Sequence, residues 1–353
     1  MDLLRTPYNA GRHVLPLAVG SAVGVCGITA GELLTLVLRD RSYLAGTEWA
    51  QVTEIIMAAY VFGLFLLVAH AWCVARVERS GWVAAGIMGL IQVVTYTALA
   101  LAGLMVWSVG AQASGDVLLP AWRVMAPVWC TALMSVGFAA WGGDRVVRLA
   151  VDRLVKWEIP GIELLPEPMD RGWSAAMLFV GGGLASGLAA SVVWYLVGLS
   201  TDRMDLGIML GAAVGGGIYF GLTFVLPHSL WRGWIVVLKG ARPGWRVPVD
   251  ASVMGLGERF VGHAPLGSDL HLPAEDGVKA LHVSVLARSD GTWYLRGLSR
   301  ARVQVRRFLQ WVTLSWDEQR PAPYETPLSQ EDVIDVGQDV QLEFVVIPRT
   351  EDS

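Results

Sequence analysis

Long apolar runs separated by short polar segments make up roughly the first two thirds of the chain. Six of these runs reach about 20 residues, the length that a helix needs to cross the hydrocarbon core of a bilayer. We therefore predict six membrane-spanning helices, at about 13–38, 49–75, 82–109, 121–141, 173–199 and 206–226. An interfacial helix over 231–238 could extend the sixth of them.

Beyond residue 240 the pattern changes to short alternating runs bounded by turn residues, which is typical of β-strands. The clearest runs lie at 281–287, 292–298, 302–306, 309–316 and 340–347. No helical pattern comes between them, so we predict an all-β sandwich. The expected organisation is a polytopic α-helical membrane domain over 1–240, followed by an all-β domain over 245–353.

The longest polar segment between predicted spans covers residues 144–171. Residues 144–157 have helical periodicity, with apolar side chains on one face and basic ones on the others. Such helices are typical of an anionic membrane surface. We therefore predict a short amphipathic helix on the cytoplasmic leaflet, followed by a stiff connection that contains three prolines.

Basic residues are distributed unevenly around the predicted spans. Thirteen lysines and arginines lie on the side of the N-terminus, against four on the other side: Arg39, Arg41, Arg123 and Arg203. Because positive charge collects on the cytoplasmic side, we predict a multi-pass protein of the cell inner (plasma) membrane with both termini in the cytoplasm. The net charge is −4, and no basic tract is present, which argues against nucleic acid as a partner.

The fifth and sixth apolar runs are rich in glycine at small-xxx-small spacing. The pairs include Gly183 with Gly187 and Gly211 with Gly215. Such spacing lets helix backbones approach closely in lipid. Three uses remain open: packing within one chain, an interface in a homo- or hetero-oligomer, and the wall of a pore.

Glu32 and Glu54 are the carboxylates that lie well inside the predicted spans. Ionisable groups at such depth are rare and often functional, so a cation or proton pathway is one interpretation. The other interpretation is structural: Glu54 reaches the outer surface, and Glu32 pairs with a neighbouring arginine or hydroxyl group.

His13, His70 and His228 fall near the inner ends of the first, second and sixth predicted spans. Histidines from facing helices can ligate haem or a pigment, although isolated interfacial histidines are commoner. The three cysteines lie inside predicted spans and are interpreted as small apolar fillers. We expect neither a metal site nor a bound cofactor.

Motifs for catalysis are missing from the sequence. It contains no phosphate-binding loop, no zinc-protease helix motif, no Cys-x-x-Cys and no nucleophile elbow. We therefore expect a protein that is not an enzyme.

The region from about 245 to 348 carries a succession of motifs that resembles a known family. It contains Gly262, the segments 268–273 and 290–295, His282, and the stretch 328–344. Together they resemble a forkhead-associated (FHA) domain. The resemblance implies an eleven-stranded sandwich whose loops at one end bind phosphothreonine peptides.

The positions that contact phosphate in this family differ in this chain. His263 stands after Gly262 where the family has arginine, and Lys279 replaces the serine of the Ser-x-x-His segment that ends at His282. Ala301-Arg302 stands in place of the family's Asn-Gly pair. Lys279, Arg300 and Arg302 could rebuild an anion site, because ammonium and guanidinium groups bind phosphate. The alternatives are a phospho-independent docking or structural domain and an altered phosphopeptide site.

These features lead to one main hypothesis and two alternatives. The chain is expected to be a non-enzymatic membrane subunit or scaffold, embedded in the lipid bilayer. Its cytoplasmic domain would mediate protein–protein interaction within a membrane complex. One alternative is an ion or solute channel or transporter regulated by that domain. The other is a haem- or pigment-binding membrane subunit.

Overall fold

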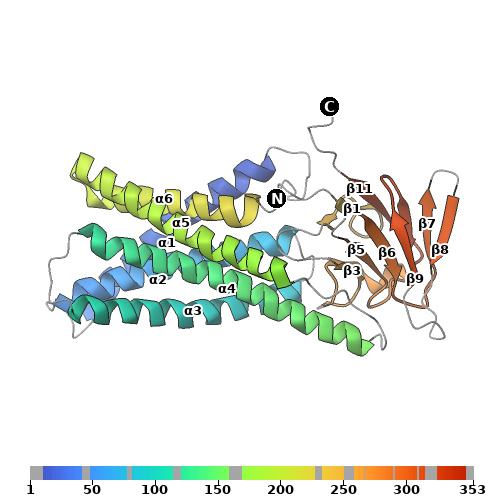
Figure 1. Cartoon of the computed structure of the whole chain (residues 1–353), viewed down its shortest axis with the longest axis horizontal. Coiled ribbons are helices and arrows are strands. Elements are labelled where there is room, and N and C mark those ends of the chain that lie inside the picture. Colours follow the sequence, from blue (N-terminus) through green and yellow to red (C-terminus); the bar gives the residue numbers. More distant parts are fainter. Residues whose placement is uncertain are drawn as a thin grey trace.

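A computed structural model describes residues 11–41, 48–77, 82–113, 121–158, 169–226, 233–249, 258–265, 267–288, 291–307, 310–314 and 324–346. It has two parts, a bundle of long helices and a β-rich domain at one end of the bundle (Figure 1). The helices are α1 (Gly11–Arg41), α2 (Glu48–Val77), α3 (Trp82–Ala113), α4 (Ala121–Glu158), α5 (Met169–Thr201) and α6 (Met204–Phe220). A π-helix, η2 (Gly221–Val225), continues α6.

Five stretches of the bundle are long and apolar enough to cross a membrane: Val14–Val37, Ile56–Cys73, Gly86–Gly103, Ala175–Thr201 and Met204–Val225. The outward surfaces of the helices are apolar as well. The exposed fractions of the side chains include 60% for Leu36, 66% for Leu90 and 70% for Met177. Helices that are apolar on their outer as well as their inner faces suit an apolar solvent such as lipid. The predicted helical region with membrane-length apolar segments is thereby confirmed.

Helix α4 differs from the prediction for residues 121–171. The sequence predicted a span that ends near Trp141 and a separate helix on the membrane surface, but one helix of 38 residues covers both. At 1.5 Å per residue its length is about 57 Å, roughly twice the hydrocarbon thickness of a bilayer. Gly143 packs against the Gln92 side chain of α3, so a tertiary contact supports the helix where glycine alone would weaken it. The predicted connection after Glu158 lies outside the described residues.

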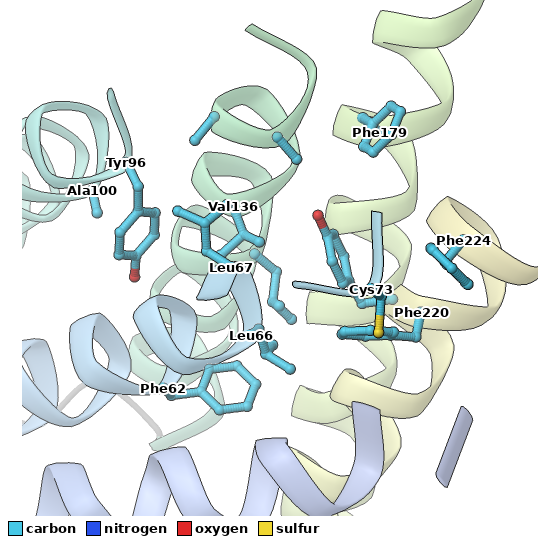
Figure 2. Close-up of a cluster of buried hydrophobic side chains, with 14 of the residues drawn as sticks. Phe62, Leu66, Leu67, Cys73, Tyr96, Ala100, Val136, Phe179, Phe220 and Phe224 are labelled. Atoms are coloured by element: carbon cyan, nitrogen blue, oxygen red, sulfur yellow. The ribbon is translucent and has the colours of Figure 1, made fainter. Parts of the chain in front are cut away.

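Aromatic and aliphatic side chains fill the centre of the bundle. Figure 2 shows part of this cluster, including Phe62, Leu66, Tyr96, Val136 and Phe220. Around it the helix backbones approach closely at glycines. The four glycines singled out in the sequence, Gly183, Gly187, Gly211 and Gly215, all face neighbouring helices of the same chain. A further role for them in an oligomer interface stays a prediction.

The strands are β1 (Gly233–Lys239), β2 (Arg246–Pro248), β3 (Glu258–Gly262), β4 (Leu270–His271), β5 (Val283–Ala287), β6 (Trp293–Gly297), β7 (Val303–Arg307), β8 (Gln310–Leu314), β9 (Tyr324–Leu328), β10 (Val333–Val336) and β11 (Val340–Val346). They form two sheets, ordered β2-β1-β11-β10-β7-β8 and β4-β3-β5-β6-β9. Ile235, Val285, Leu295, Val305 and Phe344 are among the side chains buried in the shared core. The predicted sandwich is confirmed.

The sandwich begins earlier than the predicted boundary between residues 240 and 245. An interfacial helix over residues 231–238 was one possible continuation of the sixth span, but Gly233–Lys239 is strand β1, antiparallel to β11. Ile235, Val236 and Val237 are β-branched and therefore favour a strand. The prediction for this segment is wrong because the partner that decides its conformation lies about a hundred residues further along the chain.

Trp234 joins the two parts of the molecule. Its side chain is buried and belongs to the same cluster as Phe220, Phe224 and Cys73 of the helices. Ile235, the next residue, belongs to the core of the sandwich. Successive residues of a strand point to opposite faces, so β1 packs against the bundle on one side and against its own domain on the other.

Candidate functional site

Three loops lie at one end of the sandwich, and we call them the apical loops. They connect β3 to β4 (263–269), β4 to β5 (272–282) and β6 to β7 (298–302). The strand register brings them together, because Val261 at the end of β3 pairs with Val283 at the start of β5. Val283 in turn pairs with Gly297 at the end of β6. The residues that the sequence singled out in this domain all lie in or beside these loops.

Gly262 lets the first two apical loops close on each other. A Cβ atom at this position would lie 2.0 Å from the carbonyl oxygen of Ala280, closer than any real side chain could come. The amide groups of His263 and Ala264 donate hydrogen bonds to the carbonyl oxygens of Lys279 (3.1 Å) and Ala280 (3.0 Å). Glycine is therefore required here for a close backbone approach.

His282 has a structural position beneath the loops. It is fully buried, and its Nδ1 accepts a hydrogen bond of 3.1 Å from the amide of Lys279. Burial, aided by the charge of Lys279, lowers the pKa of His282 to about 4, so the ring is neutral at neutral pH. Its backbone donates to Val261 and accepts from Leu298. His282 thus holds the loops in place and does not face solvent.

The basic side chains of the loops lie at the surface. Lys279, Arg300 and Arg302 are exposed, and His263 is half-buried. The Arg302 guanidinium donates a hydrogen bond of 3.4 Å to the hydroxyl of Thr313 on β8. The loops therefore present cations on an ordered backbone, which can attract acidic or phosphorylated groups of a partner.

A further arginine near this end was missed in the sequence. Arg242, in the turn between β1 and β2, stacks over the ring of Trp245 at 4.1 Å from its centroid. Burial lowers the pKa of His271 on β4, and the nearby charges of Arg242 and His263 add to this effect. Arg242 belongs to none of the family's motifs, so only the fold brings it close to the apical loops.

The residues singled out inside the helices remain apart from this site. Glu32 of α1 is half-buried, and its backbone oxygen accepts a hydrogen bond from Thr35. His70 is buried among the rings of Phe179, Tyr219, Phe220 and Phe224, with centroids at 5.6–6.3 Å. The side chains of Glu54 and His13 and the whole of His228 lie outside the described residues. The expectation that the chain binds no cofactor stays a prediction, and ligation of a haem or pigment by these histidines stays its alternative.

Comparison with known proteins gives matches among solved structures, whereas no family model and no curated protein matches the sequence. An FHA domain of a hypothetical protein from Arabidopsis thaliana is 17% identical, with a TM-score of 0.26, over 33% of this chain and 87% of that one. The FHA domain of the CT664 protein from Chlamydia trachomatis is 20% identical, with a TM-score of 0.25, over 33% and 99%. An engineered FHA domain with a Myc-pTBD peptide is 19% identical, with a TM-score of 0.28, over 35% and 96%. Each match therefore covers about a third of this chain and most of the smaller protein.

Proposed function

We propose that this chain is a non-enzymatic subunit or scaffold of a membrane complex, and that its C-terminal domain binds a protein partner. One observation carries the proposal. The apical loops keep a close-packed backbone, with Gly262 against Ala280 and His282 buried beneath them, while their exposed residues include Lys279 and Arg300. An ordered set of loops with altered side chains supports docking with altered specificity.

The helical part is proposed to cross the membrane six times, with the first half of α4 as a span in addition to the five apolar stretches. Figure 1 supports an even number of crossings, because α1 begins at the end of the bundle where the β domain lies. Five crossings would place the start of α1 and the β domain on opposite sides. The excess of Lys and Arg on that side favours the cytoplasm.

Both termini are therefore expected in the cytoplasm of a cell whose plasma membrane holds this protein. A reporter enzyme that works only after export, fused after Ser353, should give no signal in intact cells. The same reporter fused within residues 114–120, between α3 and α4, should be active and serves as the control. A strong signal from the C-terminal fusion would reject the orientation.

Phosphothreonine peptides should bind the full-length protein weakly or not at all. Charge-assisted hydrogen bonds to phosphate supply much of such affinity, and His263 and Lys279 occupy positions where the family has arginine and serine. Calorimetry on protein in lipid nanodiscs measures this directly. A fragment that starts at residue 245 is unsuitable because it lacks β1. Micromolar binding that disappears when the phosphate is removed would contradict the prediction.

Purification in gentle detergent tests the docking role itself. A chain that copurifies with the full-length protein should be lost when the protein is truncated after Leu226, because the β domain is then missing. The amount of the copurifying chain should also fall at least tenfold when Lys279→Glu is combined with Arg300→Glu. Asp339→Ala, in an exposed ion pair with Lys239 outside the apical loops, serves as the control. A partner retained by the truncated helices would refute docking through this domain.

A further inference from the structure

Strand β8 ends the six-stranded sheet with an open edge. Among the described strands it pairs with β7 alone. Alternate residues of such a strand direct their N–H and C=O groups away from the neighbour. Edge strands are usually protected by charged residues, proline or a bulge, but Gln310-Trp311-Val312-Thr313-Leu314 contains neither charge nor proline. As far as the described residues go, the outer edge of β8 is therefore open to an additional strand.

Trp311 is the most prominent side chain on this edge. It is 67% exposed and lies opposite Arg306 in the register of β7 and β8. The Arg306 guanidinium is 5.7 Å from the centroid of the indole ring and forms an ion pair with Asp335 of β10. The indole thus has a cation at its face while most of its surface stays open, and exposed tryptophan is a residue type that often anchors interfaces.

Arg302 adds a charge on the same face of the sheet. Its guanidinium contacts the hydroxyl of Thr313 at 3.4 Å, and Thr313 stands two residues from Trp311. Residues two apart share one face of a strand. A strand added beside β8 would therefore meet the indole at one position and a guanidinium near the next position on that face. An acidic side chain fits the second position, because guanidinium binds carboxylate bidentately.

Strand β8 of a second copy in the same membrane cannot pair with this edge. The sheet starts at the bundle, where Trp234 of β1 packs among helical residues, and β8 lies on the far side of the domain (Figure 1). Antiparallel pairing of two β8 strands needs a twofold axis perpendicular to the sheet. That axis would carry the second bundle to the opposite side, out of the shared membrane. Strand β8 of a second copy is therefore excluded as the occupant.

We propose that the edge of β8 is a strand-addition site for an extended acidic segment of a soluble partner, anchored by Trp311 and selected by Arg302. This mode of recognition takes its affinity from backbone hydrogen bonds and its specificity from alternate side chains. It rests on the proposed function only for the cytoplasmic position of the domain. The surface shares Arg302 with the apical loops but includes neither Lys279 nor Arg300, so Trp311→Ala and Lys279→Glu are the variants that distinguish the two sites.

A displayed library of random ten-residue peptides, selected on the full-length protein in nanodiscs, tests the site. Selected peptides should carry acidic residues at alternate positions and should bind Trp311→Ala or Arg302→Glu at least tenfold more weakly. Trp157→Ala is the matched control, because Trp157 is 81% exposed on α4, and binding to it should be unchanged. Bound peptide should also slow amide hydrogen exchange in β8.

Three outcomes would overturn this site. The first is equal binding of the selected peptides to all three variants, and the second is a selection that enriches no peptide. Peptides that respond to Lys279→Glu but not to Trp311→Ala would place docking at the apical loops, which agrees with the proposed function and rejects the β8 edge. Unchanged protection of the β7 amides against hydrogen exchange in Trp311→Ala verifies that the sheet is intact. Arg302→Glu is a second, independent test of the site, because it leaves the indole of Trp311 in place.

Discussion

Replacing Asp269 with alanine should destabilise the β domain by about 3–5 kcal/mol, the cost of leaving one buried charge without its partner. The Arg259 guanidinium lies 3.0 Å from the carboxylate, and the two side chains are 2% and 9% exposed. The same carboxylate accepts a hydrogen bond of 2.9 Å from the amide of Phe260. Alanine would remove both interactions while Arg259 stays inside the domain.

Hydrogen exchange of the β5 amides in the full-length protein measures this loss, because these amides report opening of the domain. Asp339→Ala is the control, since its ion pair with Lys239 is more than 60% exposed on both sides and an ion pair screened by solvent contributes little to stability. Replacing both partners together, Arg259→Met with Asp269→Leu, should restore most of the protection. A loss below 1 kcal/mol in Asp269→Ala would show that the pair is not buried as described.

Replacing Gly183 with leucine should disrupt the helix bundle. A Cβ atom on Gly183 would lie 2.3 Å from the backbone oxygen of Leu133 on α4, so α4 and α5 would have to separate. Overpacking of this kind costs about 1–3 kcal/mol or more. Gly181→Leu is the matched control in the same helix, because nothing lies within 4 Å of its Cβ position. Thermal unfolding in detergent should show a lower midpoint for Gly183→Leu alone.

A comparison of Gly183→Leu with Glu32→Gln separates the scaffold from the transporter. Glu32→Gln should leave both assembly and cellular function nearly intact in a scaffold, because a neutral amide at depth costs less than a charge. In a transporter that uses Glu32, the variant should assemble normally and be inactive. Recovery of the complex is measured beside the cellular phenotype for Glu32→Gln and Gly183→Leu. A well-assembled but inactive Glu32→Gln protein would reject the scaffold.

The helices were predictable because each apolar run is long enough to cross a bilayer and is bounded by polar residues. The extension of α4 was not, because the charged residues after Trp141 end the apolar signal without ending the helix. At that point Gly143 lies close to the Gln92 side chain of α3, whose amide donates a hydrogen bond of 3.2 Å to the carbonyl oxygen of Ala140, and no sequence pattern reveals these contacts. Strand β1 was misassigned for a related reason. Its apolar sequence fits the end of a helix equally well until its pairing with β11 is known.

The sequence predicted which residues shape the backbone of the candidate site, but it did not predict all of the residues that its surface presents. The motif located Gly262 and His282, which the fold uses for close approach and for tying loops together. The open edge at Trp311 could not be read from the sequence, since it depends on the order of strands in the sheet. Glu258 was equally hidden: burial raises its pKa although Arg296 lies beside it, and both residues look like ordinary surface charges in the sequence.

Because Trp234 packs into the helical cluster, the β domain has a fixed position relative to the helices. A partner bound to the domain is then held at a fixed distance from them. Strand β8 is four places from β1 in the sheet, and strands are spaced about 4.8 Å apart. The outer edge therefore lies about 20 Å beyond β1, on the side of the domain away from the helices (Figure 1). A domain on a long flexible linker would let its partner take many distances from the membrane. The β domain of this protein would keep a bound partner within a thin layer parallel to the membrane. Encounters between captured proteins would then take place by diffusion in two dimensions.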